Sequence, residues 1–160
     1  MNKTMASVCV ASALLFAGCG SARNIVMAPA DTSYRASAIE VNRAASTVQV
    51  PDEYTSYFDG KLREDVFKSF ARGNGIKLEY RFISFDEGSR FKRYLSGGIG
   101  NWGEGTLLIE ANFLDGSGKK IGSIETDAVI SGGMFGGSFE NALDKAAEKL
   151  SSYAVANFKN

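Results

Sequence analysis

Alternation of apolar and polar residues in the segment from Ile76 to Phe85 restricts the fold of this chain more than any other feature of its sequence. In the segment IKLEYRFISF, Ile76, Leu78, Tyr80 and Phe82 occupy every second position. Successive side chains of a β-strand point to opposite faces of a sheet, so this pattern predicts a strand with one buried face. The chain therefore needs a sheet with a core on at least one side.

Three more segments resemble strands. Residues 106–115 and 120–130 are rich in apolar side chains, and the sequence Asp-Gly-Ser-Gly at 115–118 between them is typical of a hairpin turn. Upstream, residues 34–41 alternate in part. The sequence thus predicts about four strands.

Two segments have apolar residues at helical spacing. Between residues 51 and 72 they recur every three or four positions, and Gly73 ends the segment. Gly60 lies inside this helix, at a cost of about 1 kcal/mol relative to alanine. Near the C-terminus, Ser138 is placed to cap a second helix with an apolar, alanine-containing face. We expect an α+β fold in the order β-α-β-β-β-α, an antiparallel sheet of about four strands with two helices packed on one face.

The first twenty residues predict export. Lys3 precedes an apolar run at 5–17 that is too short to cross a bilayer, and small residues precede Cys19. The segment LLFAGC resembles the bacterial lipobox, which implies that Cys19 carries acyl chains and becomes the mature N-terminus. We expect residues 1–18 to be a signal peptide, 19–33 a lipidated tether and 34–160 a single α+β domain. The alternative is an ordinary secretory signal in which Cys19 is incidental.

Composition narrows the classes of function. Lys plus Arg equals Asp plus Glu at 18 each, so no overall field attracts nucleic acid. The chain contains no histidine, which removes the commonest general base and the commonest metal ligand. Cys9 leaves with the signal peptide, and lipidation occupies Cys19. We therefore expect no catalytic residues, no metal, no cofactor and no nucleic-acid partner, in a protein that is not an enzyme.

Two glycine-rich segments, together with the lipobox, carry a resemblance to a known family. The matching residues are Gly88, Ser89, Arg90, Arg93, Tyr94, Gly97, Gly98, Gly100, Gly103 and Gly105 in the first segment, and Gly132, Gly133, Phe135, Gly136 and Gly137 in the second. Over roughly the second half of the chain, these residues resemble the bacterial lipoproteins grouped as domain of unknown function 4410. This resemblance implies an envelope location rather than an activity.

The glycines have two interpretations. Residues 98–103 match G-x-G-x-x-G, but a strand rather than a helix follows, so the context of a dinucleotide site is missing. In the simpler interpretation the glycines form turns and close backbone contacts. In the other, the bare backbone is a contact surface for a partner. The candidate contact glycines are Gly98, Gly100, Gly103, Gly136 and Gly137.

Arg90 and Arg93 also have two interpretations. They pair with nearby carboxylates and hold their loop, or they bind an anionic envelope group such as lipid A or peptidoglycan. Because Gly20, not aspartate, follows Cys19, resemblance to enterobacterial lipoproteins implies the periplasmic face of the outer membrane. The expected function is a lipid-anchored, non-enzymatic module that binds another envelope protein or itself. Binding of an anionic ligand through Arg90 and Arg93 is the alternative.

Overall fold

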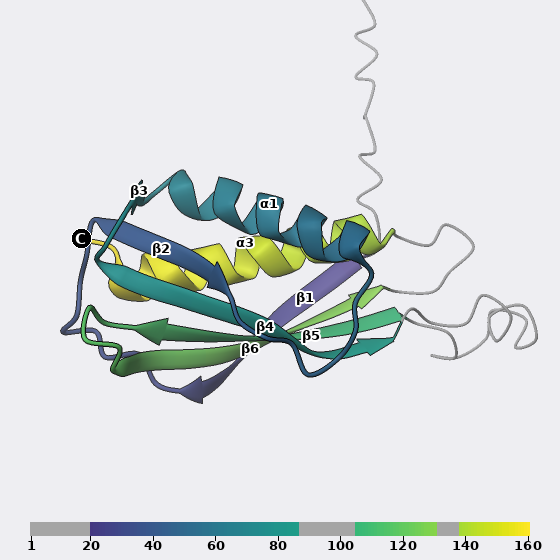
Figure 1. Cartoon of the computed structure of the whole chain (residues 1–160), viewed down its shortest axis with the longest axis horizontal. Helices are drawn as coiled ribbons and strands as arrows, with labels where there is room; N and C mark the ends of the chain where they lie inside the picture. Colours follow the sequence, from purple (N-terminus) through teal and green to yellow (C-terminus); the bar gives the residue numbers. More distant parts are fainter. Residues whose placement is uncertain (1–19, 87–104, 131–137) are drawn as a thin grey trace, which may run out of the picture.

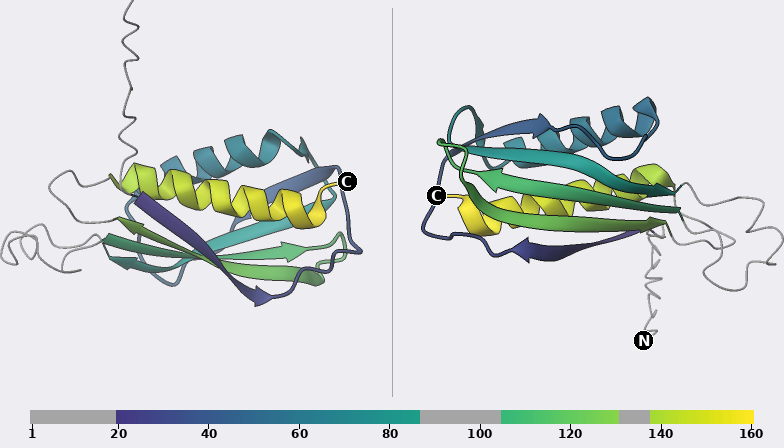
Figure 2. Two further views of the ribbon diagram at one scale, coloured as in Figure 1. Left: turned by 180° about the vertical axis from the view of Figure 1, so that it is seen from behind. Right: turned by 60° about the horizontal axis from the view of Figure 1, so that its bottom comes forward.

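A computed structural model describes residues 20–86, 105–130 and 138–160 of the chain (Figure 1). In these residues one sheet is covered on one face by two helices that lie side by side (Figures 1 and 2). The elements in chain order are β1 (Gly20–Ala28), β2 (Ala38–Arg43), α1 (Asp52–Phe67), β3 (Ala71–Arg72), β4 (Ile76–Asp86), β5 (Gly105–Leu114), β6 (Lys120–Ile130) and α3 (Phe139–Phe158).

The predicted antiparallel sheet of about four strands is wrong, because the sheet has six strands and is mixed. Its order is β1-β6-β5-β4-β2-β3. Neighbours from β1 to β4 are antiparallel, whereas β2 runs parallel to both β4 and β3. The parallel pair arises because α1 connects β2 to β4, and a helical crossover returns the chain in the same direction. The strand expected at 34–41 is displaced to Ala38–Arg43.

Strand β1 is a second difference from expectation. The segment 19–33 is predicted to be a tether, but Gly20–Ala28 forms an edge strand paired with β6. Asn24 ties this strand to the rest of the fold on two sides. Its side-chain amide donates to the carbonyl of Lys149 in α3 at 3.0 Å, and its side-chain oxygen accepts from the hydroxyl of Thr126 in β6 at 2.8 Å. These two hydrogen bonds help to hold a strand that has no regular apolar alternation.

The hairpin predicted at residues 115–118 is confirmed. The carboxylate of Asp115 accepts from the backbone N–H groups of Ser117 at 2.8 Å and Lys119 at 3.0 Å. Gly118 has φ +85°, a left-handed conformation that glycine adopts without steric cost. The turn therefore joins β5 to β6 by local chemistry that is readable in the sequence.

The core lies between the sheet and the two helices. The buried positions of β4 alternate as predicted, and α1 contributes Phe58, Leu62 and Val66. The ring of Phe58 packs edge-on against Tyr80 and Phe82, with centroids 5.2 and 5.7 Å apart. Burial of each such side chain contributes about 1.5–3 kcal/mol. These contacts fix α1 on β4.

Helix α3 begins and packs as its sequence predicts. The hydroxyl of Ser138 accepts from the N–H of Asn141 at 3.3 Å, which confirms the N-cap. Small side chains then let the helix lie close to the sheet and to α1. Its buried residues are Ala142, Leu143, Ala146, Ala147, Leu150, Ser151, Ala154 and Phe158.

Candidate functional site

The predicted site residues lie outside the described parts of the chain. The structure therefore tests neither the lipid attachment nor the contact residues, but it places the residues that flank them. The predictions in question are Cys19, Arg90, Arg93, Gly98, Gly100, Gly103, Gly136 and Gly137.

The flanking residues meet at one end of the sheet. Gly20 lies opposite Ile130, and Ile130 lies opposite Gly105 on its other side. Asp86, the last residue of β4, lies opposite Thr106 in β5. Figures 1 and 2 show that α3 also begins at this end, which we call the convergent end. Residues that border the predicted anchor and both glycine-rich segments are thus brought together, although they are distant in sequence.

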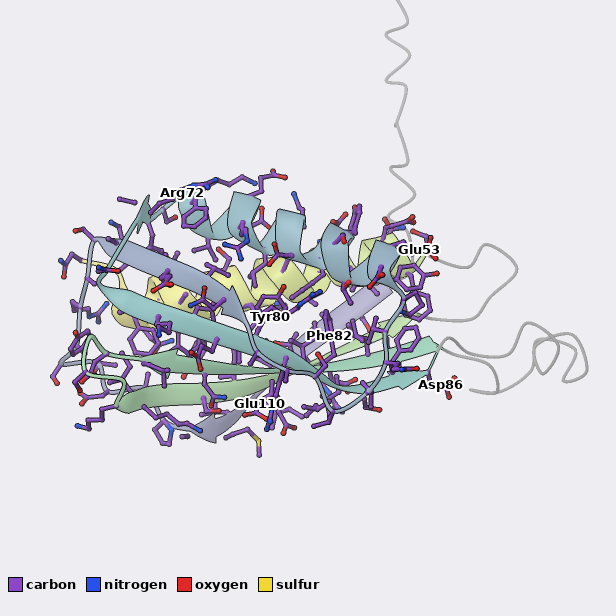
Figure 3. All side chains as sticks on the ribbon, in the orientation of Figure 1. Glu53, Arg72, Tyr80, Phe82, Asp86 and Glu110 are labelled. Carbon is purple, nitrogen blue, oxygen red and sulfur yellow. The ribbon has the colours of Figure 1, made fainter. Side chains whose placement is uncertain are left out.

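An aromatic cluster closes the core at the convergent end. The rings of Tyr54 in α1 and Phe139 in α3 stack with centroids 4.8 Å apart, and Phe85 in β4 lies 5.5 Å from Phe139. All three side chains are half-buried and pack against the core. Glu53 and Asp86 mark the ends of α1 and β4 at this position (Figure 3). The cluster therefore fixes the start of both helices to the end of β4.

A groove of about 860 Å³ lies beside this cluster. The connection between β2 and α1 forms one wall, and Phe82 and Phe85 of β4 form the other. Thr47 holds the connection in place, because its N–H donates to the carbonyl of Phe82 at 3.0 Å. Apolar groups from Val48 and Val50 line the groove together with polar ones. Its shape and mixed lining suit a short peptide or a small polar molecule better than a large apolar ligand.

Electrostatic interactions next to the groove centre on Asp59 in α1. Burial alone raises the pKa of Asp59, but hydrogen bonds from Arg63 at 2.8 Å and Tyr80 at 2.7 Å outweigh it, with a smaller contribution from Arg43. The pKa of this carboxyl group is therefore below its ordinary value of 3.8. Burial and the hydrogen bond to Asp59 raise the pKa of Tyr80. Tyr80 therefore stays a neutral phenol and Asp59 a charged carboxylate, and the hydrogen bond between them links α1 to β4.

Strand β1 exposes a run of apolar side chains at the edge of the sheet. Ile25 is 41% exposed, and Val26 and Met27 are each 56% exposed. In the described residues, these are three of the four large hydrophobic side chains that are exposed. The charged side chain in this strand, Arg23, pairs with Asp127 at 3.0 Å. Sequence reasoning missed this surface, although Ile-Val-Met in an otherwise small and polar segment was a signal for it.

The face of the sheet opposite the helices is built from ion pairs. Arg81 donates to Glu110 at 2.6 Å. Burial alone raises the pKa of Glu110, but the hydrogen bonds from Arg81 and Asn112 outweigh it, so this pKa is lowered. Figure 3 shows Glu110 on the side of the sheet away from the helices. Arg81 and Glu110 therefore form a cross-strand pair that accounts for both charges as a structural contact.

Residues 20–86, 105–130 and 138–160 contain no group of three or more acidic, histidine or cysteine side chains placed to hold a metal ion. In the same ranges, no helix combines the length and the apolar character needed to cross a bilayer.

Among the solved structures that resemble this chain are two of PelC. The chain resembles a single-substitution variant of the PelC dodecamer from Paraburkholderia phytofirmans, with 19% identity over 82% of this chain and 95% of that one, and a TM-score of 0.47. It also resembles the PelC dodecamer from the same organism in another crystal form, with 17% identity, the same coverage and the same TM-score.

Comparison by sequence gives a family. No curated protein matches the chain. A family model described as "Domain of unknown function (DUF4410)" matches residues 46–133. This range is more than half of the 160 residues. It includes α1, β3, β4, β5, β6 and most of the groove, and it leaves out β1, β2 and α3. The chain therefore belongs to the DUF4410 family.

Proposed function

We propose that this protein is a non-enzymatic, lipid-anchored module of the bacterial envelope that binds another protein chain through the edge of its sheet. The observation that carries the proposal is the exposed run Ile25, Val26 and Met27 on edge strand β1. An edge strand has unpaired backbone N–H and C=O groups, and apolar side chains beside them favour the addition of a further strand. Soluble monomers rarely leave such a combination uncovered.

The predicted anchor supports the same proposal. Gly20 directly follows Cys19 and is already paired with Ile130. A lipid on Cys19 would therefore hold β1 next to the membrane with no free tether between them. We place the protein on the periplasmic face of the outer membrane, as the lipobox and Gly20 imply. Membrane attachment keeps copies and partners in two dimensions, which raises the effective concentration for contacts at this edge.

The anchor is tested by substitution of single cysteines. Cys19→Ala should release the protein from the membrane fraction, because the acyl chains provide the attachment. Cys9→Ala is the matched control, since this residue leaves with the signal peptide, and it should change nothing. Mass spectrometry of the mature N-terminal peptide should find the lipid on Cys19. Membrane attachment of the Cys19→Ala protein would contradict the proposal.

The interaction is tested by capture of the full chain from membranes in mild detergent. A stoichiometric partner or an oligomer should be recovered, and Met27→Lys should remove it because a charge at the edge opposes strand addition. Ser152→Lys is the matched control, because this exposed residue lies on α3, away from the β1 edge. An isolated monomer in the parent protein would count against an interaction module.

Binding of an anionic envelope ligand is the second candidate, and one observation favours it. Arg43 lines the groove, and within the described segments its side chain forms no hydrogen bond or salt bridge, although its charge helps to lower the pKa of Asp59. A guanidinium group in this position suits a phosphate or carboxylate. Arg90 and Arg93 remain the predicted clamp. Retention of the protein on lipid A or peptidoglycan fractions tests this candidate.

A further inference from the structure

We infer that the occupant of the β1 edge is a second copy of this chain, paired through an antiparallel β1–β1 contact centred on Ile25. This inference rests on the proposed interaction function and names the partner. In such a pair Ile25 lies opposite Ile25 of the other copy, Val26 opposite Asn24, and Met27 opposite Arg23. The two sheets join into one continuous sheet with a two-fold axis at its middle.

The side chains of β1 are complementary to themselves in this register. Ile25 is 41% exposed and Met27 56% exposed, and each would meet apolar atoms of the other copy. Met27 would lie along the aliphatic part of Arg23, whose guanidinium group stays with Asp127. The two Arg23 residues are separated by the central pairs, so like charges do not meet. One strand thus supplies both halves of the contact.

The edge has some of the features that oppose strand pairing, but they leave its centre open. Natural edge strands are protected by charged side chains, proline, inward-pointing charges or β-bulges. Between Gly20 and Ala28 the charged residue is Arg23, and Pro29 comes only after the strand ends. The irregularity in the β1–β6 register between Val26 and Ala28 limits the regular part of the strand at its far end. The contact is therefore expected to be short and centred where the exposed apolar side chains are.

The register has a consequence for the anchors. In a pair centred on Ile25, the two Gly20 residues are ten positions apart along the joined strands, or roughly 33 Å at about 3.3 Å per residue. The two-fold axis that relates the copies runs perpendicular to the sheet. If both Cys19 lipids enter one bilayer, the joined strands lie along the membrane surface. In this orientation β1 runs parallel to the bilayer, whereas a single anchor at Gly20 would also allow β1 to stand perpendicular to it.

The pairing is tested by disulfide formation in isolated membranes. Opposite Cβ atoms in an antiparallel pair are about 4.5–5.5 Å apart, close to the distance that a disulfide requires. Ile25→Cys in the full chain should therefore give a covalent dimer on mild oxidation. Ser117→Cys, at the exposed tip of the β5–β6 turn, is the matched control and should stay monomeric, as should the parent chain with Cys9 and Cys19.

A charge variant gives an independent readout. Val26→Lys should lower the fraction of dimer measured by native mass spectrometry about tenfold, while Ser152→Lys should leave it unchanged. Far-UV circular dichroism shows whether each variant keeps the parent fold, as expected for side chains this exposed. The Ile25→Cys experiment does not depend on that variant.

The outcomes separate this inference from the function on which it rests. A homodimer cross-linked at residue 25 supports the inference. A cross-link from residue 25 to a different protein overturns self-pairing and leaves the interaction module standing. An oligomer that does not cross-link at residue 25 overturns the register, and a parent protein that is monomeric without any cross-link overturns both.

Discussion

Two glycine-to-alanine substitutions should have opposite effects on stability, although each adds one methyl group. A Cβ atom at Gly75 would lie 2.3 Å from the carbonyl oxygen of Ala38 and 3.2 Å from the Cβ of Ala36. The first distance is far inside van der Waals contact, and the obstacle is backbone that cannot rotate away. A Cβ at Gly60 would meet nothing within 4 Å. Gly75 therefore has no room for a methyl group, whereas Gly60 has.

The magnitudes follow from these distances. Overpacking costs about 1–3 kcal/mol. A shift of Ala38 also disturbs the junction of β2 and β3, where the N–H of Ala71 donates to the carbonyl of Ser37 at 2.9 Å, a hydrogen bond worth about 1 kcal/mol. We expect Gly75→Ala to lose about 3 kcal/mol. Gly60→Ala should gain about 0.5–1 kcal/mol, because alanine loses less backbone entropy in a helix.

The assay is urea unfolding of the purified full chain, followed by far-UV circular dichroism in one detergent. For a domain of this size, about 1 kcal/mol corresponds to roughly 3 °C in Tm, so thermal melts should place the two variants more than about 10 °C apart. If Gly75→Ala is as stable as the parent, the close approach to Ala38 does not exist as described. If Gly60→Ala is destabilised, α1 is not a regular helix at that position.

Three further outcomes are expected. Tyr80→Phe should cost about 1–2 kcal/mol of unfolding free energy at neutral pH. This difference from the parent should shrink on acidification, because the stability that comes from the lowered pKa of Asp59 is present above pH 3.8 and is lost as pH falls through the folded-state pKa. A difference that does not depend on pH in urea unfolding would contradict this. Phe139→Ala should cost about 2 kcal/mol through the loss of half-buried aromatic contacts, and an unchanged unfolding midpoint would show that the cluster contributes nothing. Changing Arg90 and Arg93 together to Gln should abolish retention on lipid A or peptidoglycan fractions if these residues bind an anion, and unchanged retention would exclude that role.

The sequence was sufficient wherever local chemistry decides the structure. The alternation in β4 was visible because one face is buried and the other is not. The turn at Asp115 and the helix cap at Ser138 were visible because these side chains accept hydrogen bonds from nearby backbone N–H groups. Apolar spacing also located α1 and α3. In each case the residues that determine the element belong to the element itself or directly adjoin it.

Long-range pairing was not predictable in the same way. Apolar spacing does not state a strand's direction, and the parallel pairing of β2 with β4 follows from the crossover through α1, which the expectation of an antiparallel sheet did not take into account. Strand β1 depends on partners more than a hundred residues away, such as Thr126 and Lys149, which bond Asn24. A stretch of small and polar residues without alternation therefore resembled a tether, because what makes it a strand is supplied by β6 and α3.

The position of β1 changes what a lipid at Cys19 would do. With a tether, the domain would sample many orientations and the anchor would only restrict its distance from the membrane. With Gly20 already paired to Ile130, one peptide unit of about 3.8 Å separates the acylated residue from the sheet. Lipidation would then hold the convergent end, from which β1 starts, at the membrane surface. A partner that pairs with β1 would do so within a short distance of that surface, which favours another chain anchored in the same leaflet over one that diffuses freely in the periplasm.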